Sequence, residues 1–182
     1  MKKIVFYGSG NISQALISGL LSSGYKKNLI EFIDRNKINS RKTKKLGATK
    51  TNLKTIDTKS IIFLGVKPKD AMNAYAEICA VVKKPKIVSL VAGIKSNKYL
   101  SESKDVELIR AMPNTSSQFN KGITAICNCN ANKTTFNQVS SIFKKVGTTV
   151  DITKENQIDD FTGLIGSGPA YFFYLLKVYE KR

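Results

Sequence analysis

Short apolar runs alternate along this chain with longer stretches in which apolar residues recur every three or four positions. The runs are nearly continuous and rich in β-branched and aromatic residues, which is typical of strands buried on both faces of a parallel sheet. The intervening stretches predict helices. The predicted strands are residues 3–7, 29–33, 48–51, 60–66, 86–92, 106–111, 122–128 and 148–152, and the predicted helices are residues 11–21, 36–45, 68–82 and 132–145. This alternation predicts an α/β fold with a Rossmann-like, doubly wound, mostly parallel sheet.

A glycine turn, Gly8-Ser9-Gly10-Asn11, joins the first predicted strand to the first predicted helix. Glycine suits a turn that lies against a phosphate, because a side chain would clash with the phosphate and the tight reversal can require positive φ. The free N–H groups at the start of the following helix attract an anion. A G-x-G pattern alone is weak evidence, and Ala15 follows it where the full fingerprint would have a third glycine nearby. The strand–turn–helix context nevertheless favours a nucleotide site over an ordinary turn.

The second predicted strand ends at Asp34-Arg35, at the distance along the chain where a dinucleotide-binding unit places its ribose-reading residue. Asp34 can accept a hydrogen bond from a ribose 2′-OH, which favours NADH. Arg35, Lys37 and Arg41 can instead hold a 2′-phosphate, which favours NADPH, although all of them can equally be solvated charges at a helix start. We expect NADPH and keep NADH as possible.

The chain of 182 residues is 42% hydrophobic, which predicts a globular protein with a sizeable core. Its formal charge of +17 comes from basic residues spread through the chain, without a nucleic-acid-binding pattern. We therefore expect the charge to steer an anionic cofactor and substrate, and expect no nucleic-acid partner. Neither a signal peptide nor an apolar run of membrane-spanning length is apparent, so we expect a soluble cytoplasmic protein with no membrane partner.

The chain contains no histidine, which excludes Ser-His-Asp and Cys-His catalysis and histidine-ligated metals. Cys127 and Cys129 are too close together, and too isolated from other ligands, to predict a zinc site. With Cys79 they suit a reducing compartment better than a disulfide framework. Chemistry in this chain must therefore rely on hydroxyls, lysines, carboxylates, water or a cofactor, and we expect no metal.

Motifs along essentially the whole chain resemble, in order, those of the pyrroline-5-carboxylate reductases. They are GSGNISQA near the start, LGVKP at 64–68, SLVAGI at 89–94, RAMPNT at 110–115 and GSGPAYFF at 166–173. The last two are the specific ones, since many nucleotide-binding reductases share the glycine turn. The resemblance implies NAD(P)H-dependent reduction of 1-pyrroline-5-carboxylate to L-proline, the last step of proline biosynthesis. It also implies a cytoplasmic homo-oligomer built from dimers.

The resemblance also assigns site residues. The implied cofactor-binding residues are Gly8, Ser9, Gly10, Asn11, Ile12, Asp34, Arg35, Asn52, Val66, Lys67, Pro68, Ala92 and Gly93. Those implied to lie near the substrate are Met112, Pro113, Asn114 and Ser167. A protonated imine is already electrophilic, so the protein must mainly align it with the nicotinamide and exclude water. No catalytic acid or base is therefore assigned.

The chain also departs from the family pattern. Ile165 stands where the family usually has serine and Gly163 where it usually has alanine, and the family continues as a helical dimerisation domain. We expect a nucleotide-binding domain over 1–153 and the incomplete start of that helical domain over 154–182. Residues 169–179 are apolar on nearly every side, and such a helix is normally buried. This pattern favours a fragment or a truncated gene product, which is incomplete for catalysis alone.

Two other functions stay open. One is a reductase of the related β-hydroxyacid dehydrogenase group, which is disfavoured because residues 162–170 lack the lysine that those enzymes carry on the corresponding helix. The other is a non-enzymatic nucleotide-binding module. The first predicts turnover of a 3-hydroxy acid, and the second predicts cofactor binding without turnover.

Overall fold

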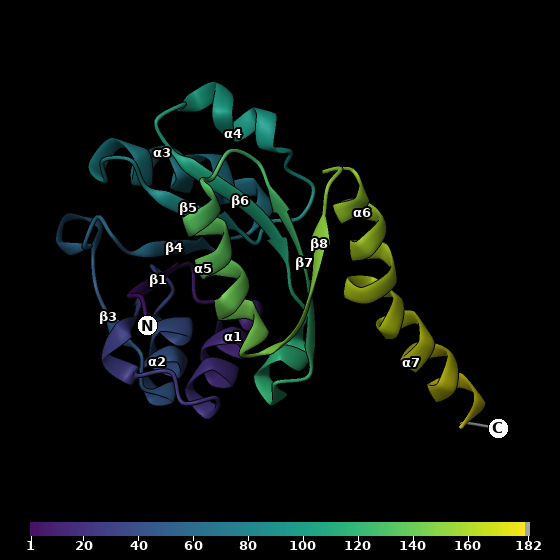
Figure 1. The fold of residues 1–182 in the computed structure, drawn as a ribbon. Coiled ribbons are helices and arrows are strands. Elements are labelled where there is room, and N and C mark those ends of the chain that lie inside the picture. The colour runs from purple at the N-terminus through teal and green to yellow at the C-terminus, as the bar shows by residue number, and fades with distance from the viewer. Residues whose placement is uncertain (181–182) are drawn as a thin grey trace.

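The computed structural model describes residues 1–180 and contains an eight-stranded sheet in the order β3-β2-β1-β4-β5-β6-β7-β8 (Figure 1). The strands are β1 (Ile4–Tyr7), β2 (Ile30–Ile33), β3 (Thr49–Lys50), β4 (Ile61–Leu64), β5 (Lys86–Ser89), β6 (Glu107–Met112), β7 (Gly122–Asn128) and β8 (Gly147–Ile152). The α-helices are α1 (Asn11–Ser22), α2 (Lys37–Leu46), α3 (Ala71–Val81), α4 (Ser96–Glu102), α5 (Lys133–Lys144), α6 (Gln157–Phe161) and α7 (Gly168–Tyr179). The predicted fold class, a Rossmann-like and mostly parallel sheet, is confirmed.

The pairing of β6 with β7 is antiparallel, while every other neighbouring pair of strands runs parallel. The connection between these two strands holds only a 3₁₀ turn, Thr115–Phe119. A parallel return needs a crossover of a dozen or more residues, so this short connection reverses the chain direction. β8 then returns parallel to β7 because α5 provides the necessary crossover.

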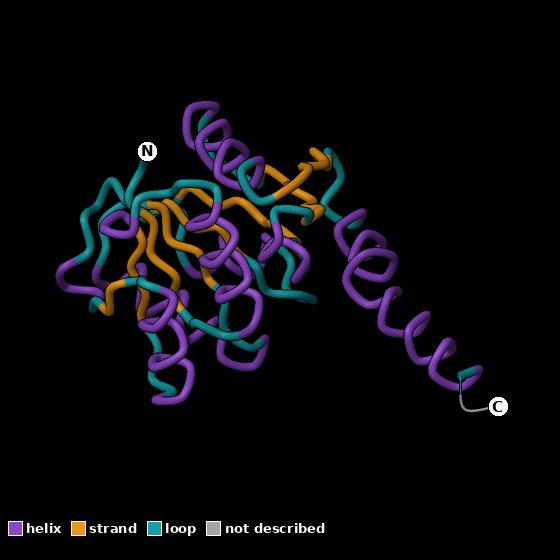
Figure 2. Tube along the Cα trace, turned by 90° about the horizontal axis from the view of Figure 1, so that it is seen from below, coloured by secondary structure: helices purple, strands orange, loops and turns teal. Residues whose placement is uncertain are grey.

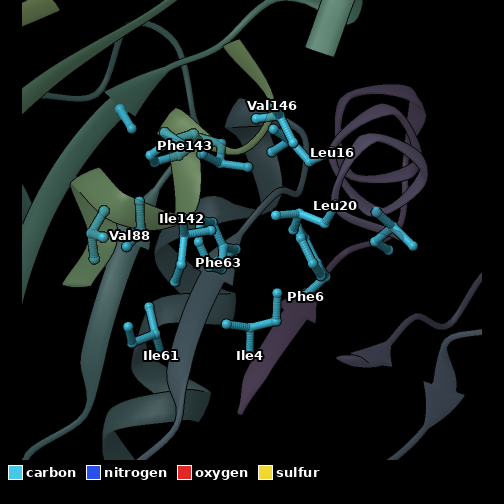
Figure 3. Packing of buried hydrophobic residues seen from close by; sticks show 14 of the residues in the cluster. Ile4, Phe6, Leu16, Leu20, Ile61, Phe63, Val88, Ile142, Phe143 and Val146 are labelled. Carbon is cyan, nitrogen blue, oxygen red and sulfur yellow. The ribbon is translucent and has the colours of Figure 1, made fainter. Parts of the chain in front are cut away.

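Two hydrophobic cores lie on opposite faces of the sheet. The first contains side chains of β1 and β4 with those of α1 and α5, and the second contains the alternate strand residues with those of α3 and α4. In the first core Phe63 stacks on Phe6 with ring centroids 5.0 Å apart and meets the edge of Phe143 at 5.7 Å (Figure 3). Alternate residues of each strand therefore serve different layers, which explains the continuous apolar runs.

Several element boundaries differ from those predicted. β4 ends at Leu64 and β5 at Ser89, before the predicted ends at residues 66 and 92. The predicted helix over 68–82 begins as a 3₁₀ turn, Pro68–Asp70, and becomes α-helical at Ala71. α4 was not predicted, because its sequence is short and polar and only Tyr99 is buried. Strand ends and short helices depend on tertiary contacts that local periodicity does not report.

α6 packs against β6 and β7, where its Ile158 is fully buried beside Met112 and Ala125, and α7 then extends away from the sheet (Figures 1 and 2). A π-helical turn, Thr162–Ser167, joins the two helices. Many large apolar side chains of α7 are exposed, among them Tyr171 at 74% and Phe173 at 68%. Among the described residues, no helix is both long enough and apolar enough to span a membrane. The described chain therefore leaves the apolar surface of α7 uncovered.

An ion pair between a buried arginine and a partly exposed glutamate anchors the chain just before these helices. Glu155, between β8 and α6, accepts hydrogen bonds from Arg110 Nη1 at 2.8 Å and from the Ser96 N–H and hydroxyl at 2.6 and 2.7 Å. The Arg110 side chain is 2% exposed. Burial alone would raise the pKa of Glu155, but the hydrogen bonds from Ser96 and Arg110 outweigh it and hold the pKa below its usual value. This joint fixes the exit from β8 onto α4 and β6.

Candidate functional site

A cleft of about 450 Å³ lies at the carboxyl ends of β1, β2 and β4. The chain adds β2 and β3 on one side of β1 and β4 on the other, so the cleft is at the point where the strand order reverses. Ligands of open α/β sheets bind at such a point. The lining residues are Tyr7, Gly8, Ser9, Gly10, Ile33, Asp34, Arg35, Asn36, Asn39, Gly65, Val66, Lys67, Lys69, Asp70, Asn73, Ala74 and Glu77.

The glycine turn forms the floor of this cleft, and its two glycines have different reasons to be glycine. Gly8 has φ of +91°, and a Cβ there would come within 2.7 Å of Val66 Cγ1 and 2.8 Å of the Gly65 backbone. Only glycine fits this close approach of two strand ends. A Cβ on Gly10 would meet no atom within 4 Å. The space above Gly10 is therefore open, as a backbone that receives a phosphate requires.

The start of α1 faces the same turn. Within the described residues, no side chain caps the N-terminus of α1, and its first turn holds no acidic residue. The N–H groups of that turn are therefore available, and the helix dipole makes this end positive. An open glycine backbone beside an uncapped helix start is the arrangement that binds a phosphate or pyrophosphate.

Asp34 ties the end of β2 to the glycine turn. Its Oδ2 accepts hydrogen bonds from the Ser9 N–H and the Ser9 hydroxyl, both at 2.7 Å, and its Oδ1 accepts one from the Asn36 N–H at 2.7 Å. A carboxylate offers about four acceptor positions, so these three leave one for a ligand. Asp34 thus shapes the turn as well as facing the cleft.

Arg35, Glu77 and Tyr7 form a chain of contacts that we call the bridge. Arg35 Nη2 lies 2.6 Å from Glu77 Oε1, and the Tyr7 hydroxyl donates to the other Glu77 oxygen. Burial, then the bond to Glu77, raises the pKa of Tyr7 to about 12. The hydrogen bonds from Tyr7 and then Arg35 lower the pKa of Glu77. At neutral pH the bridge therefore holds a neutral phenol, a carboxylate and a guanidinium.

The cleft brings together part of the predicted site. Gly8, Ser9, Gly10, Asp34, Arg35, Val66 and Lys67 line it. Other predicted site residues do not line the described cleft: Asn11, Ile12, Asn52, Pro68, Ala92, Gly93, Met112, Pro113 and Asn114. The alternative ligands for a 2′-phosphate, Lys37 and Arg41, do not line it either. The side chain of Ser167 lies outside the described residues.

Several residues outside the cleft have structural contacts of their own. Asn52 Oδ1 caps a 3₁₀ turn by accepting from the Lys54 N–H at 3.0 Å. Met112 is buried, and Asn114 Oδ1 accepts from the Ile123 N–H at 3.1 Å, which fixes the connection between β6 and β7. These contacts leave the predicted ligand roles of Asn52, Met112 and Asn114 untested.

Sequence reasoning missed the wall of the cleft that α3 and the turn before it provide. Asp70, Asn73 and Glu77 line it at intervals of three and four residues. Side chains at this spacing share one face of a helix. A polar stripe following the strand stop at Lys67-Pro68 was the signal that could have found them. Tyr7 was missed because it reads as an ordinary strand residue.

Comparison with known proteins identifies the family. Residues 3–93 match the family described as "NADP oxidoreductase coenzyme F420-dependent". The chain is 32% identical to pyrroline-5-carboxylate reductase 1 of Bacillus subtilis, over 99% of this chain and 63% of that protein. It is 30% identical to the pyrroline-5-carboxylate reductase of Pasteurella multocida, over 99% of this chain and 69% of that protein. This chain belongs to the pyrroline-5-carboxylate reductase family.

Solved structures of pyrroline-5-carboxylate reductases share the fold. The Coxiella burnetii enzyme superposes with a TM-score of 0.87 at 28% identity, covering 97% of this chain and 68% of that one. The Plasmodium falciparum pyrroline carboxylate reductase, solved with NADP bound, gives a TM-score of 0.84 at 25% identity over 97% and 67% of the two chains. This chain thus spans about two thirds of the length of its relatives, and 63% of the Bacillus subtilis protein.

Proposed function

We propose that this chain binds NADPH in the cleft and supplies the nucleotide-binding part of an enzyme that reduces 1-pyrroline-5-carboxylate to L-proline. The observation that carries the proposal is the open backbone at Gly10 beside the uncapped start of α1, at the end of the cleft that Asp34 and Arg35 flank. Family membership and the NADP-bound Plasmodium falciparum relative support this choice of cofactor. NADH is the alternative.

The glycine turn suits a phosphate in both space and charge. A bulky anion can approach Gly10, where a Cβ would meet nothing within 4 Å, while the α1 N–H groups attract it. In this proposal Gly8 to Ile12 hold the pyrophosphate, and Asp34, Arg35 and Asn52 lie near the adenosine ribose. Val66, Lys67, Pro68, Ala92 and Gly93 flank the nicotinamide.

The bound nicotinamide would supply a hydride, and the residues of this chain would position the acceptor. Met112, Pro113, Asn114 and Ser167 are proposed to lie on the substrate side. The buried Met112 and Pro113 help to exclude water, and the amide of Asn114 can orient a polar group. A protonated cyclic imine is already electrophilic, so this arrangement requires no strong base.

The proposal divides the chain into a nucleotide-binding domain over 1–153 and part of a helical dimerisation domain over 154–182. The exposed aromatic side chains of α7, such as Tyr171 and Phe173, support an assembly in which a second copy covers them, as a homo-oligomer built from dimers would. Three free cysteines support a location in the reducing cytoplasm.

The test is the oxidation of NADPH by the chain joined to the helical dimerisation domain of a relative, with and without 1-pyrroline-5-carboxylate, followed by detection of L-proline. A 3-hydroxy acid serves as the competing substrate. Proline formation that depends on both reactants supports the proposal. Saturable binding of NADPH with no turnover at any substrate concentration would instead favour the non-enzymatic module, and oxidation of the hydroxy acid with NADP⁺ would favour the β-hydroxyacid dehydrogenase group.

A further inference from the structure

The bridge connects two separate walls of the cleft. Arg35 follows β2, Glu77 lies on α3, and Tyr7 ends β1 between them. All three side chains belong to residues that line the cleft. Of the three candidate ligands for a 2′-phosphate, Arg35 lines the cleft whereas Lys37 and Arg41 do not, and Arg35 already has a carboxylate partner from the opposite wall.

The ion pair between Arg35 and Glu77 is weak enough for a bound phosphate to replace Glu77 as the partner of Arg35. Arg35 is 83% exposed and Glu77 is 40% exposed, and ion pairs in such surroundings are weak. A phosphate monoester carries about −1.5 to −2 charges at neutral pH and accepts the paired hydrogen bonds of a guanidinium. Such a group can displace one carboxylate oxygen from Arg35, whereas an uncharged ribose hydroxyl cannot.

Glu77 is less free than Arg35 to move away. The Tyr7 hydroxyl donates to its second oxygen, and Tyr7 itself is buried, with 8% exposure. When Arg35 turns toward a ligand, the Glu77 carboxylate thus stays in the cleft. Its negative charge then opposes any further negative charge that binds nearby.

We propose that Glu77 sets the preference of the cleft between dinucleotides with and without a 2′-phosphate, by competing for Arg35 and repelling the phosphate. This inference rests on the proposed function, because it assumes that a dinucleotide occupies the cleft. Arg35 supplies the attraction for the phosphate, and Glu77 limits it. The native chain should therefore prefer NADPH over NADH only moderately, and loss of the Glu77 carboxylate should increase this preference.

The test measures the dissociation constants of NADPH and NADH by isothermal titration for the 182-residue chain and its variants. Glu77→Gln keeps the size of the side chain and removes its charge. NADPH should bind roughly three- to tenfold more tightly to this variant, while NADH changes by less than about twofold, since a weak competing pair and one repulsive charge are removed. The double variant Arg35→Gln/Glu77→Gln should lose most of the gain in NADPH affinity that Glu77→Gln shows alone, because the two residues act through one contact.

Asp70→Asn is the matched control, because Asp70 is a second carboxylate on the same wall and forms none of the described contacts of the bridge. Its ratio of NADPH to NADH affinity should stay within about twofold of the native ratio, which separates competition at Arg35 from a general charge effect. Weaker binding of NADPH to Glu77→Gln would overturn the inference and make Glu77 a residue that merely positions Arg35. An equal change for both cofactors would also overturn it. Failure of the native chain to bind either cofactor would instead contradict the proposed function.

Discussion

The sheet and α7 contain the same kinds of side chain in opposite surroundings. Phe63 in β4 is 1% exposed and contacts two other phenylalanine rings, whereas Phe173 in α7 is 68% exposed. Burial of such a side chain contributes roughly 1.5–3 kcal/mol relative to its exposure to water. Apolar composition therefore stabilises the sheet but contributes little to α7 within the described chain. The first region buries its own apolar side chains, and the second leaves them exposed.

The largest expected effect is the loss of Phe63. Phe63→Ala should lower the free energy of unfolding by about 3–5 kcal/mol, because it removes a large buried ring and leaves a cavity. Phe173→Ala is the matched change in α7 and should stay within about 0.5 kcal/mol in the isolated chain. Chemical denaturation of both variants measures the difference. Equal destabilisation by the two changes would show that α7 is buried in solution.

The joint between the two regions should give the next largest effect. Glu155→Ala should cost about 3 kcal/mol, because it leaves the guanidinium of Arg110 buried without its partner. Lys84 and Asp105 form an exposed pair with 3.9 Å between charged atoms, so Asp105→Ala is a control that should change stability by less than about 1 kcal/mol. A cost for Glu155→Ala no larger than that of the control would contradict the role of the joint.

In the glycine turn, substitution of one glycine should affect stability and substitution of the other should affect binding, with smaller changes in stability than those above. Gly8→Ala should lower stability by at least about 1–2 kcal/mol, because it forces a side chain into positive φ and against Val66. Gly10→Ala should leave the unfolding temperature nearly unchanged, since the new Cβ meets no protein atom, yet weaken dinucleotide binding at least tenfold through a clash with the phosphate. Thermal unfolding and cofactor titration of both variants test this difference. Normal NADPH affinity in Gly10→Ala would place the ligand elsewhere.

Acid should gradually weaken the contacts of Glu155 with Arg110 and Ser96. The pKa of Glu155 is lower in the folded chain than in the unfolded chain, so its stabilising contribution is complete above the unfolded pKa. It is lost as pH falls through the lowered folded value. Stability measured from neutral pH downward should therefore fall less steeply in Glu155→Gln than in the native chain. Parallel profiles would show that this carboxyl does not contribute to acid sensitivity.

The regular part of the fold was predictable from the sequence because each core strand carries a continuous apolar run. The residues 60–66 and 86–92 predicted β4 and β5 with only their ends misplaced. α4 was missed because its single buried residue, Tyr99, gives no periodic pattern. The reversal at β7 was also missed, since the direction of a strand depends on the length of its connection and not on its own residues.

In the cleft, too, some residues were predictable from the sequence and others were not. Gly8 and Asp34 were recognisable because a local motif and a strand end specify them, and the structure brings them into one hydrogen-bonded turn. Glu77 was not recognised, because its place opposite Arg35 depends on how α3 packs across β1. Local motifs thus predicted the floor of the cleft, and tertiary packing determined its wall.

The most direct test of the account is a fluorescence titration with NADPH of the native 182-residue chain beside Gly10→Ala. We expect saturable binding to the native chain, and weakening of that binding by at least tenfold in a variant that unfolds at the same temperature. That result would mean that the fold around the cleft holds a dinucleotide without further cover on α7. A native chain that is folded but binds neither NADPH nor NADH would contradict the assignment of the cleft.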